Sequence, residues 1–186
     1  MPVRPLALAL LLFLALGLVG CGPSEGQNVS LYLGSVTIHE RRLQVSADEL
    51  EALVPRLRTV PPDLAGVREK VRALQGALRE SKTEVEKLHV PTSAQDLHKQ
   101  YVEAFEVAAQ RMDRLGGLLA EQETLARDGG AAVQSRIEAL KGELAELGKR
   151  AEALDEQIRL QKIELARKFP EVQVPEADPP APAAAS

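Results

Sequence analysis

Three long segments of this chain carry an apolar residue at every third or fourth position, and this repeat restricts the fold more than any other feature. The alternating spacing averages 3.5 residues, the period at which helices wind around each other with a left-handed supercoil. The third segment is the most regular and keeps the repeat for about four heptads. We therefore expect an all-α fold. The stripe positions are Leu64, Val67, Val71, Leu74, Leu78, Ser81, Val85 and Leu88; Leu97, Tyr101, Ala104, Ala108, Arg111, Leu115, Leu118, Gln122 and Leu125; and Val133, Ile137, Leu140, Leu144, Leu147, Ala151, Leu154, Ile158, Gln161 and Leu165.

Helix-breaking residues divide this region into helices at about 62–89, 93–127 and 131–168. Pro91 separates the first two, Gly129-Gly130 separates the second from the third, and Phe169-Pro170 ends the third. Both connections are short, so consecutive helices should be antiparallel. The sequence predicts an antiparallel three-helix, coiled-coil-like bundle. A reversal at residue 91 would place Ser81 opposite Tyr101.

The residues before the bundle give weaker signals. Ser46-Ala47-Asp48-Glu49 has the form of a capping box and predicts a short helix at about 46–57, so that the helical domain covers 46–169. Apolar and polar side chains alternate between Val29 and Ile38, which predicts a small extended or irregular segment at 31–45. Residues 21–30 are rich in glycine and polar side chains and predict a flexible tether. The proline- and alanine-rich residues 170–186 predict a disordered tail.

The chain begins with the features of an export signal. Arg4 precedes an apolar run from Leu6 to Val19, which is shorter than the roughly 20 residues that a membrane-spanning helix needs. The run ends in Leu18-Val19-Gly20-Cys21, and Cys21 is the only cysteine of the chain. We expect residues 1–20 to be removed on export.

The segment Leu18-Val19-Gly20-Cys21 resembles the lipobox of bacterial lipoproteins. This resemblance implies that Cys21 becomes the first residue and carries a diacylglyceryl group, usually with a third acyl chain such as palmitate on its amine. Two or three chains anchor a protein stably to a membrane. Gly22, in place of aspartate, implies the outer membrane, facing the periplasm, in a host with two membranes. The alternative is an ordinary secretory signal cleaved near residues 15–17.

Charge and composition exclude several classes of function. The net charge is −4, and it becomes −5 once residues 1–20, which contain only Arg4, are removed. A mildly acidic chain is poorly suited to binding nucleic acid. The absence of Trp, with only three Phe and two Tyr, argues against a deep aromatic enzyme pocket. The stripes are filled by leucine and alanine, which predicts few gaps for a ligand.

No residue pattern predicts a catalytic, cofactor-binding or metal site. Glu86 and His89 have the Glu-x-x-His spacing of di-iron bundles, but such a site needs a second copy, and His98 has Gln95 at the matching position. We expect His39 to be solvated. The polar stripe residues Arg111 and Gln122 are interpreted as positions that set helix register.

Two features do not fit a simple rod. Gly116-Gly117 lies within the second long helix, either as a weak point on an outward face, the preferred interpretation, or as a hinge. Leu160 and Ile163 are apolar but lie off the stripe. They require cover from residues 31–38, from the helix at Ser46 or from another copy.

The resulting hypothesis is a membrane-anchored envelope lipoprotein that acts as a non-enzymatic structural or adaptor module. Its partners would be the membrane, through Cys21, and an envelope protein or another copy of the chain, with no role for nucleic acid. The alternative is a periplasmic binding or chaperone-like module for a lipid or an unfolded client. Two weaker alternatives are the helical hairpin of an efflux-type adaptor, for which residues 28–45 offer too few strands, and an enzyme.

Overall fold

The computed structural model describes residues 23–52, 55 and 64–172, and within these ranges the chain forms helices and no strand. The helices are α2 (Glu25–Glu51), α4 (Leu64–Glu86), the short 3₁₀ turn η1 (Thr92–Ala94), α5 (Gln95–Asp128) and α6 (Ala131–Lys168). The predicted all-α class is confirmed. The export signal with Cys21, and residues 173–186 of the predicted tail, lie outside the described residues.

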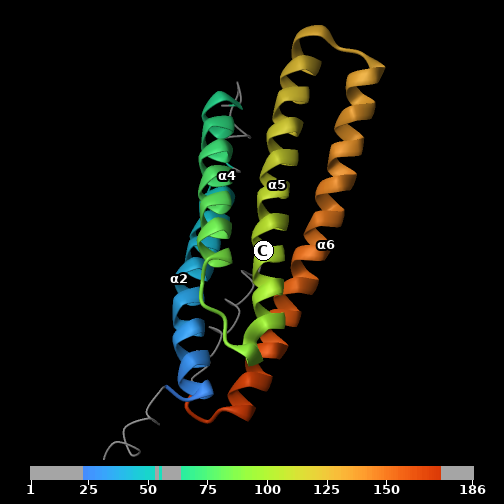
Figure 1. Ribbon diagram of the computed structural model, residues 1–186. Coiled ribbons are helices and arrows are strands. Elements are labelled where there is room, and N and C mark those ends of the chain that lie inside the picture. The colour runs from blue at the N-terminus through green and yellow to red at the C-terminus, as the bar shows by residue number, and fades with distance from the viewer. Residues whose placement is uncertain (1–22, 53–54, 56–63, 173–186) are drawn as a thin grey trace, which may run out of the picture.

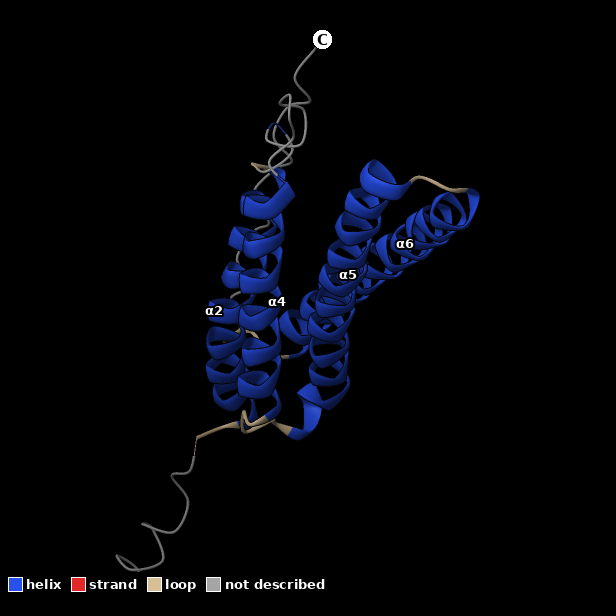
Figure 2. Ribbon diagram, turned by 90° about the horizontal axis from the view of Figure 1, so that it is seen from above, coloured by secondary structure: helices blue, strands red, loops and turns tan. Residues whose placement is uncertain are grey.

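The four long helices run alternately up and down, with α5 packed between α4 and α6 (Figure 1). The Glu25 carboxylate, at the start of α2, accepts hydrogen bonds from the Ser93 backbone N–H and hydroxyl at 3.1 and 2.8 Å. We call this end of the bundle, where η1 also lies, the basal end. The opposite end, with the turn at Gly129-Gly130, is the distal end. Figure 2 shows α2 beside α4 and α6 beside α5.

The three predicted long helices are present, and their stripes are buried to different extents. On α4 the buried residues are Val67, Val71, Leu74, Leu78, Ser81 and Val85, all of them predicted stripe positions. On α6 only the two ends of the stripe are buried, at Val133, Ile137, Leu154, Ile158 and Leu165. The ion pairs in its middle, from Arg114 to Glu143 and from Arg150 to Glu103, join α6 to α5 alone. A single neighbouring helix leaves this stretch half-buried.

Beyond Tyr101 the predicted stripe of α5 is only partly buried, and its most buried positions lie beside it. Phe105 and Leu119 are buried instead of Ala104 and Leu118, and Arg111 is exposed. Because α5 is the central helix and contacts neighbours on more than one side, one stripe cannot describe its buried surface.

The predicted register between α4 and α5 is also wrong. A reversal at residue 91 would place residue 100 opposite Lys82, whereas the Lys82 ammonium lies 2.6 Å from the Glu106 carboxylate and Arg79 lies 3.0 Å from Asp113. The extra turn η1 after Pro91 lengthens the connection and shifts α5 relative to α4. Ser81 and Tyr101 are both buried, but at different levels of the bundle.

Residues 31–45 are helical, so the predicted extended segment is wrong, as is a tether that reaches residue 30. The capping box lies at Ser24 and Gln27. The Gln27 N–H donates to Ser24 Oγ at 3.1 Å, and the Ser24 N–H donates to Gln27 Oε1 at 2.9 Å. No helix begins at Ser46, whose hydroxyl donates to the Arg42 carbonyl within α2.

Hydroxyl residues fit within α2 because Ser35, Thr37 and Ser46 each donate a hydrogen bond to a carbonyl one turn earlier in the helix. Ser35 Oγ donates to the Leu31 carbonyl at 3.0 Å and Thr37 Oγ1 donates to the Leu33 carbonyl at 2.8 Å. The buried residues Val29, Tyr32, Leu33, Val36 and His39 recur at the helical period, and they outweigh the alternating pattern that predicted a strand.

Most of the buried apolar residues that the structure describes fall into two separate cores. We call the larger one the basal core, and it draws on α2, α4, α5 and α6. Its members are Val29, Tyr32, Leu33, Val36, Leu78, Val85, Ala94, Leu97, Tyr101, Phe105, Ala109, Ile158, Leu165 and Val172. Among the residues that the structure describes, the distal core contains Val67, Val71 and Leu119. The burial of Val172 shows that the predicted disordered tail does not begin at residue 170.

The structure shows where the two features that did not fit a simple rod lie, namely Gly116-Gly117 and the off-stripe pair Leu160 and Ile163. A Cβ atom built on Gly116 would lie 3.9 Å from Val71 of α4, and one built on Gly117 would lie 3.7 Å from Leu140 of α6. Both glycines therefore face neighbouring helices, and the outward-face interpretation is wrong. Ile163 is half-buried, whereas Leu160 remains 52% exposed, without cover from the described residues.

Candidate functional site

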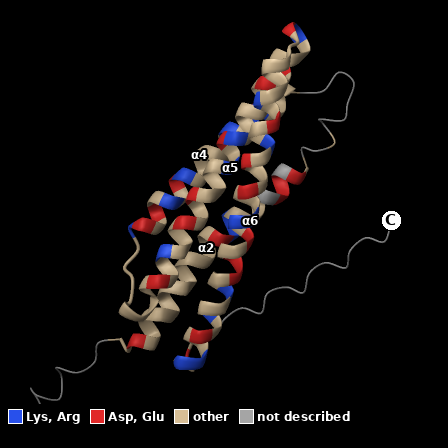
Figure 3. Ribbon diagram, turned by 90° about the vertical axis from the view of Figure 1, so that its right-hand side faces the viewer, with Lys and Arg blue, Asp and Glu red and all other residues tan. Residues whose placement is uncertain are grey.

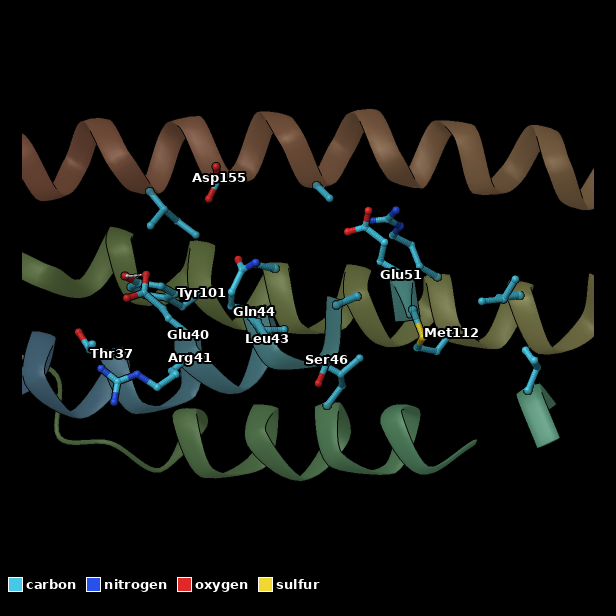
Figure 4. A pocket seen from close by; sticks show the side chains of 18 residues that line it. Thr37, Glu40, Arg41, Leu43, Gln44, Ser46, Glu51, Tyr101, Met112 and Asp155 are labelled. Atoms are coloured by element: carbon cyan, nitrogen blue, oxygen red, sulfur yellow. Dashed lines mark hydrogen bonds between the residues drawn. The ribbon is translucent and has the colours of Figure 1, made fainter. Parts of the chain in front are cut away.

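A groove of about 910 Å³ lies in the middle of the bundle, between the basal and distal cores. Its floor is apolar and follows α5 through Ala104, Ala108 and Met112. Ala151 and Ile158 of α6 also line it. Figure 4 shows Asp155 of α6 on one side of α5 and the labelled residues of α2, such as Arg41, on the other. The prediction of few gaps between the helices is wrong at this place.

Small side chains produce this groove. The residues Ala104, Ala108 and Ala151 occupy predicted stripe positions, where other parts of the bundle place leucine or an aromatic residue. Where larger side chains elsewhere in the bundle hold the helix axes at the wide end of the usual range of roughly 8–10 Å, an alanine side chain leaves space between them. The signal for the groove was therefore present in the sequence, as three alanines within the stripes.

The rim of the groove is polar and charged. Arg41 and Glu51 come from α2, Arg111 from α5 and Asp155 from α6. Lysine and arginine alternate with acidic residues along the helices (Figure 3), and most of them form ion pairs. Arg41 and Arg111 are exposed and have no ion-pair partner among the described residues. The groove therefore combines an apolar floor with two cations at its edge that no described carboxylate pairs with.

A polar cluster closes the basal end of the groove. The Tyr101 hydroxyl donates to Glu40 Oε1 at 2.7 Å, and the Lys162 ammonium donates to the same oxygen at 2.5 Å. The ammonium also lies 5.6 Å from the centroid of the Tyr101 ring, a cation–π arrangement. Burial raises the pKa of the Tyr101 phenol, and the charge of Glu40 adds to the rise, so the phenol stays a hydrogen-bond donor. The cluster ties α2, α5 and α6 together.

Two histidines lie near this cluster. The Tyr32 hydroxyl lies 3.3 Å from His98 Nδ1, and burial lowers the pKa of His98. His39 is only 8% exposed, so the prediction of a solvated histidine is wrong. Helix α2 turns it inward, edge-on to Phe105 with ring centroids 6.3 Å apart. Its Nδ1 is buried without a hydrogen bond, and Glu84 Oε2 lies 3.6 Å away.

The residues considered for metal binding do not come together. Helix α4 ends at Glu86, so His89 lies beyond it and the two exposed side chains do not share a helix face. Within the ranges that the structure describes, no group of three or more His, Cys, Asp or Glu residues could hold a metal ion. Of the polar stripe residues, Arg111 lies at the rim of the groove and Gln122 is half-buried.

Comparisons of this chain with protein-family models, with curated proteins and with solved structures give no match. None of the described helices is long and apolar enough to cross a membrane.

Proposed function

We propose that this chain is a membrane-anchored envelope lipoprotein whose helical bundle is a non-enzymatic adaptor, that is, a protein-interaction module. The proposed anchor is lipid on Cys21, after removal of residues 1–20, and the lipobox-like Leu18-Val19-Gly20-Cys21 supports it. Helix α2 begins four residues later, at Glu25, so the basal end would lie next to the membrane. In a host with two membranes, Gly22 favours the outer one, with the bundle in the periplasm.

The groove is the observation that carries the adaptor role. Its floor on α5 extends from Tyr101 to Leu115, about 21 Å or four helical turns. A surface of this shape, apolar below and charged at the edge, suits an amphipathic helix, whose apolar face would fill the space above the alanines. Arg41 and Arg111, at the edge of the groove, would pair with acidic residues that flank this apolar face.

A lipid acyl chain is the second candidate occupant. The apolar part of the floor, formed by Ala104, Ala108, Met112 and Leu115, is continuous and without charge, which would suit an acyl chain as well as a helix. An anionic headgroup would then contact Arg41 or Arg111. This alternative corresponds to a lipid-binding module of the periplasm.

The intact mass of the mature chain, isolated from membranes, tests the anchor. We expect a chain that begins at Cys21 with the added mass of two or three acyl chains. A Cys21→Ala variant should leave the membrane fraction. An unmodified thiol at Cys21 would overturn the anchor and leave the groove to be tested separately.

Photo-cross-linking in intact cells tests the groove. A photoreactive residue at Ala108 should capture one recurrent protein, and the captured peptide should be an amphipathic helix. The control is the same residue at Gln134, which is exposed on α6 near the distal turn. Capture of lipid at position 108 would favour the second candidate. Equal capture at both positions would contradict both.

A further inference from the structure

The chain passes from the end of α6 to the start of α2, on the side of α2 that leads to the groove. The Ser24 hydroxyl donates to Glu171 Oε1 at 3.2 Å, and a Cβ atom built on Gly26 would collide with the same carboxylate. Val172 is buried in the basal core. The residues that follow, 173–186, therefore start beside the first turn of α2, and we call them the C-terminal segment.

A single strip of α2 connects this starting point to the rim of the groove. Its four residues, at separations of four, seven and four positions along the helix, lie on one helix face, and they are Gly26, Ser30, Thr37 and Arg41. Ser30 lies beside Glu171 at the basal end, and Thr37 and Arg41 line the groove. The first three side chains of the strip are small, so an extended segment can lie along it as far as Arg41.

The C-terminal segment has the charge and the length to pair with Arg41. It contains two carboxylates, Glu176 and Asp178, and neither lysine nor arginine. The rise from Gly26 to Arg41 along α2 is roughly 22 Å at about 1.5 Å per residue. An extended chain with about 3.1 Å per residue covers the same distance between Glu171 and Asp178. Asp178 can therefore reach Arg41, which is exposed and has no ion-pair partner among the described residues.

The other carboxylates that line the groove agree with this path. Figure 4 shows Arg41 and Asp155 on opposite sides of α5, so a segment with two carboxylates is drawn to the α2 side and repelled from the α6 side. The Glu40 carboxylate is held by Tyr101 and Lys162. Glu51 comes ten residues after Arg41 on α2, beyond the level that Asp178 reaches.

The residues after Asp178 suit the apolar floor of the groove. They are small and uncharged, with the sequence Pro179-Pro180-Ala181-Pro182-Ala183-Ala184-Ala185-Ser186. As a polyproline II helix they span roughly 25 Å, against about 21 Å for the floor. This conformation makes no internal hydrogen bonds, so its backbone can stay in water on the open side of the groove. Proline also restricts the unbound chain, which lowers the entropy lost on binding.

We propose that the C-terminal segment binds in the groove of its own chain, with Asp178 paired to Arg41 and the proline–alanine stretch over Ala104 and Ala108. Linkage within one chain raises the effective concentration of the segment, so contacts that are weak between separate molecules suffice. A partner helix needs the same floor, and the segment is therefore a competitor that the partner displaces. This consequence rests on the proposed function.

Photo-cross-linking of the purified chain, reconstituted in phosphatidylcholine vesicles without any partner, tests the binding. A photoreactive residue at Ala108 should become linked to a peptide from residues 173–186 of the same chain. The yield should be at least ten times that from the same residue at Gln134, which is exposed near the distal turn. Equal yields at the two positions would overturn the proposal, as would a link that occurs only between two chains.

Charge reversal tests the pairing with Arg41. Asp178→Arg should lower the yield at position 108 at least fivefold, and adding Arg41→Asp should restore it. The matched control is Glu164→Arg, which makes the same change of charge at an exposed residue of α6 and should leave the yield unchanged. A full yield from Asp178→Arg alone, or no recovery in the double variant, would contradict the pairing.

Removal of residues 173–186 in cells tests the competition. With a photoreactive residue at Ala151, the shortened chain should capture the partner at least three times more than the full chain does. Equal or lower capture would contradict the competition. Capture by neither chain would contradict the proposed function, whereas the reconstituted chain decides the binding of the C-terminal segment by itself.

Discussion

The basal and distal ends of this bundle are built from the same kind of apolar stripe but reach different packing. At the basal end α2 joins the other three helices, and 14 buried residues form a continuous core. At the distal end the described part of the chain contributes three buried residues to the core, Val67, Val71 and Leu119. The groove lies between the two. The difference shows that two factors decide whether a heptad-like pattern forms a filled core or leaves a groove. These are the size of the stripe residues and the number of helices that meet.

Side-chain volume along α5 also differs between the basal core, the groove and the distal core. Tyr101 and Phe105 fill the basal core, Ala104 and Ala108 leave the groove, and Gly116-Gly117 lies beside the distal core. A bundle of this kind is rigid where it is filled and able to accept a partner where it is not. Substitutions in each region can test this contrast.

The largest expected effect is the loss of an aromatic residue from the basal core. Phe105 is fully buried, and Phe105→Ala should lower the free energy of unfolding by about 3–5 kcal/mol. Leu119→Ala in the distal core should cost about 2–3 kcal/mol, because fewer neighbours lose contact there. Chemical denaturation measures both. Equal losses would remove the distinction between the two cores.

Disruption of the polar cluster at the basal end of the groove should have the next largest effect on stability. Glu40→Ala would leave Lys162 and Tyr101 without their shared acceptor, and the Lys162 side chain is only 17% exposed. We expect a loss of about 2 kcal/mol in the free energy of unfolding. Glu40→Gln is the matched control and should cost less, because its amide oxygen still accepts from Tyr101. If Glu40→Ala is as stable as the unsubstituted chain, the cluster does not stabilise the packing of α2.

The glycine pair should respond in the opposite direction. An alanine at Gly116 or Gly117 would make ordinary contacts of 3.9 or 3.7 Å with neighbouring side chains. Each substitution should therefore stabilise the distal end by about 0.5–1 kcal/mol, since alanine favours a helix over glycine. Hydrogen exchange of the amides in residues 112–128 should slow. Destabilisation by either alanine would mean that the helices need to approach more closely there.

The smallest expected effect is a pH dependence from the basal end. Burial lowers the pKa of His98 from its ordinary 6.5, against a smaller opposing effect of Glu86. The unfolded chain then binds more protons than the folded chain just below pH 6.5, so stability is complete above that pH and falls as the pH drops toward the folded pKa. His98→Gln should reduce the change in melting temperature between pH 7.5 and 5.5. If His98→Gln shows the same change in melting temperature between these two pH values, the pH dependence comes from other groups.

The sequence predicted the helices with the most regular stripes and missed the one whose pattern was mixed. The expected range 131–168 is the observed range of α6, because its stripe is regular and Gly129-Gly130 marks its start. The helix α2 was missed because Val29, Leu31 and Leu33 also alternate like a strand. The capping box at Ser24 and Gln27 was the signal that would have identified it.

Contacts between helices were harder to predict than the helices themselves. The register of α4 on α5 depends on how many residues the connection uses, and η1 could not be read from the stripe pattern. The burial of His39 followed from the missed helix. The alanines of the stripes were the sequence signal for the groove, but only the packing of neighbouring helices showed that no other described side chain fills it.

The groove is proposed to be a binding site and not a packing gap, and filling it distinguishes the two. Ala108→Leu should leave the melting temperature unchanged or raise it, because the added side chain occupies open space over an apolar floor. A photoreactive residue at Ala151 would report on the partner in the same cells. We predict that Ala108→Leu abolishes capture of that partner. A stable Ala108→Leu chain that still captures the partner at full yield would contradict a binding role for the groove.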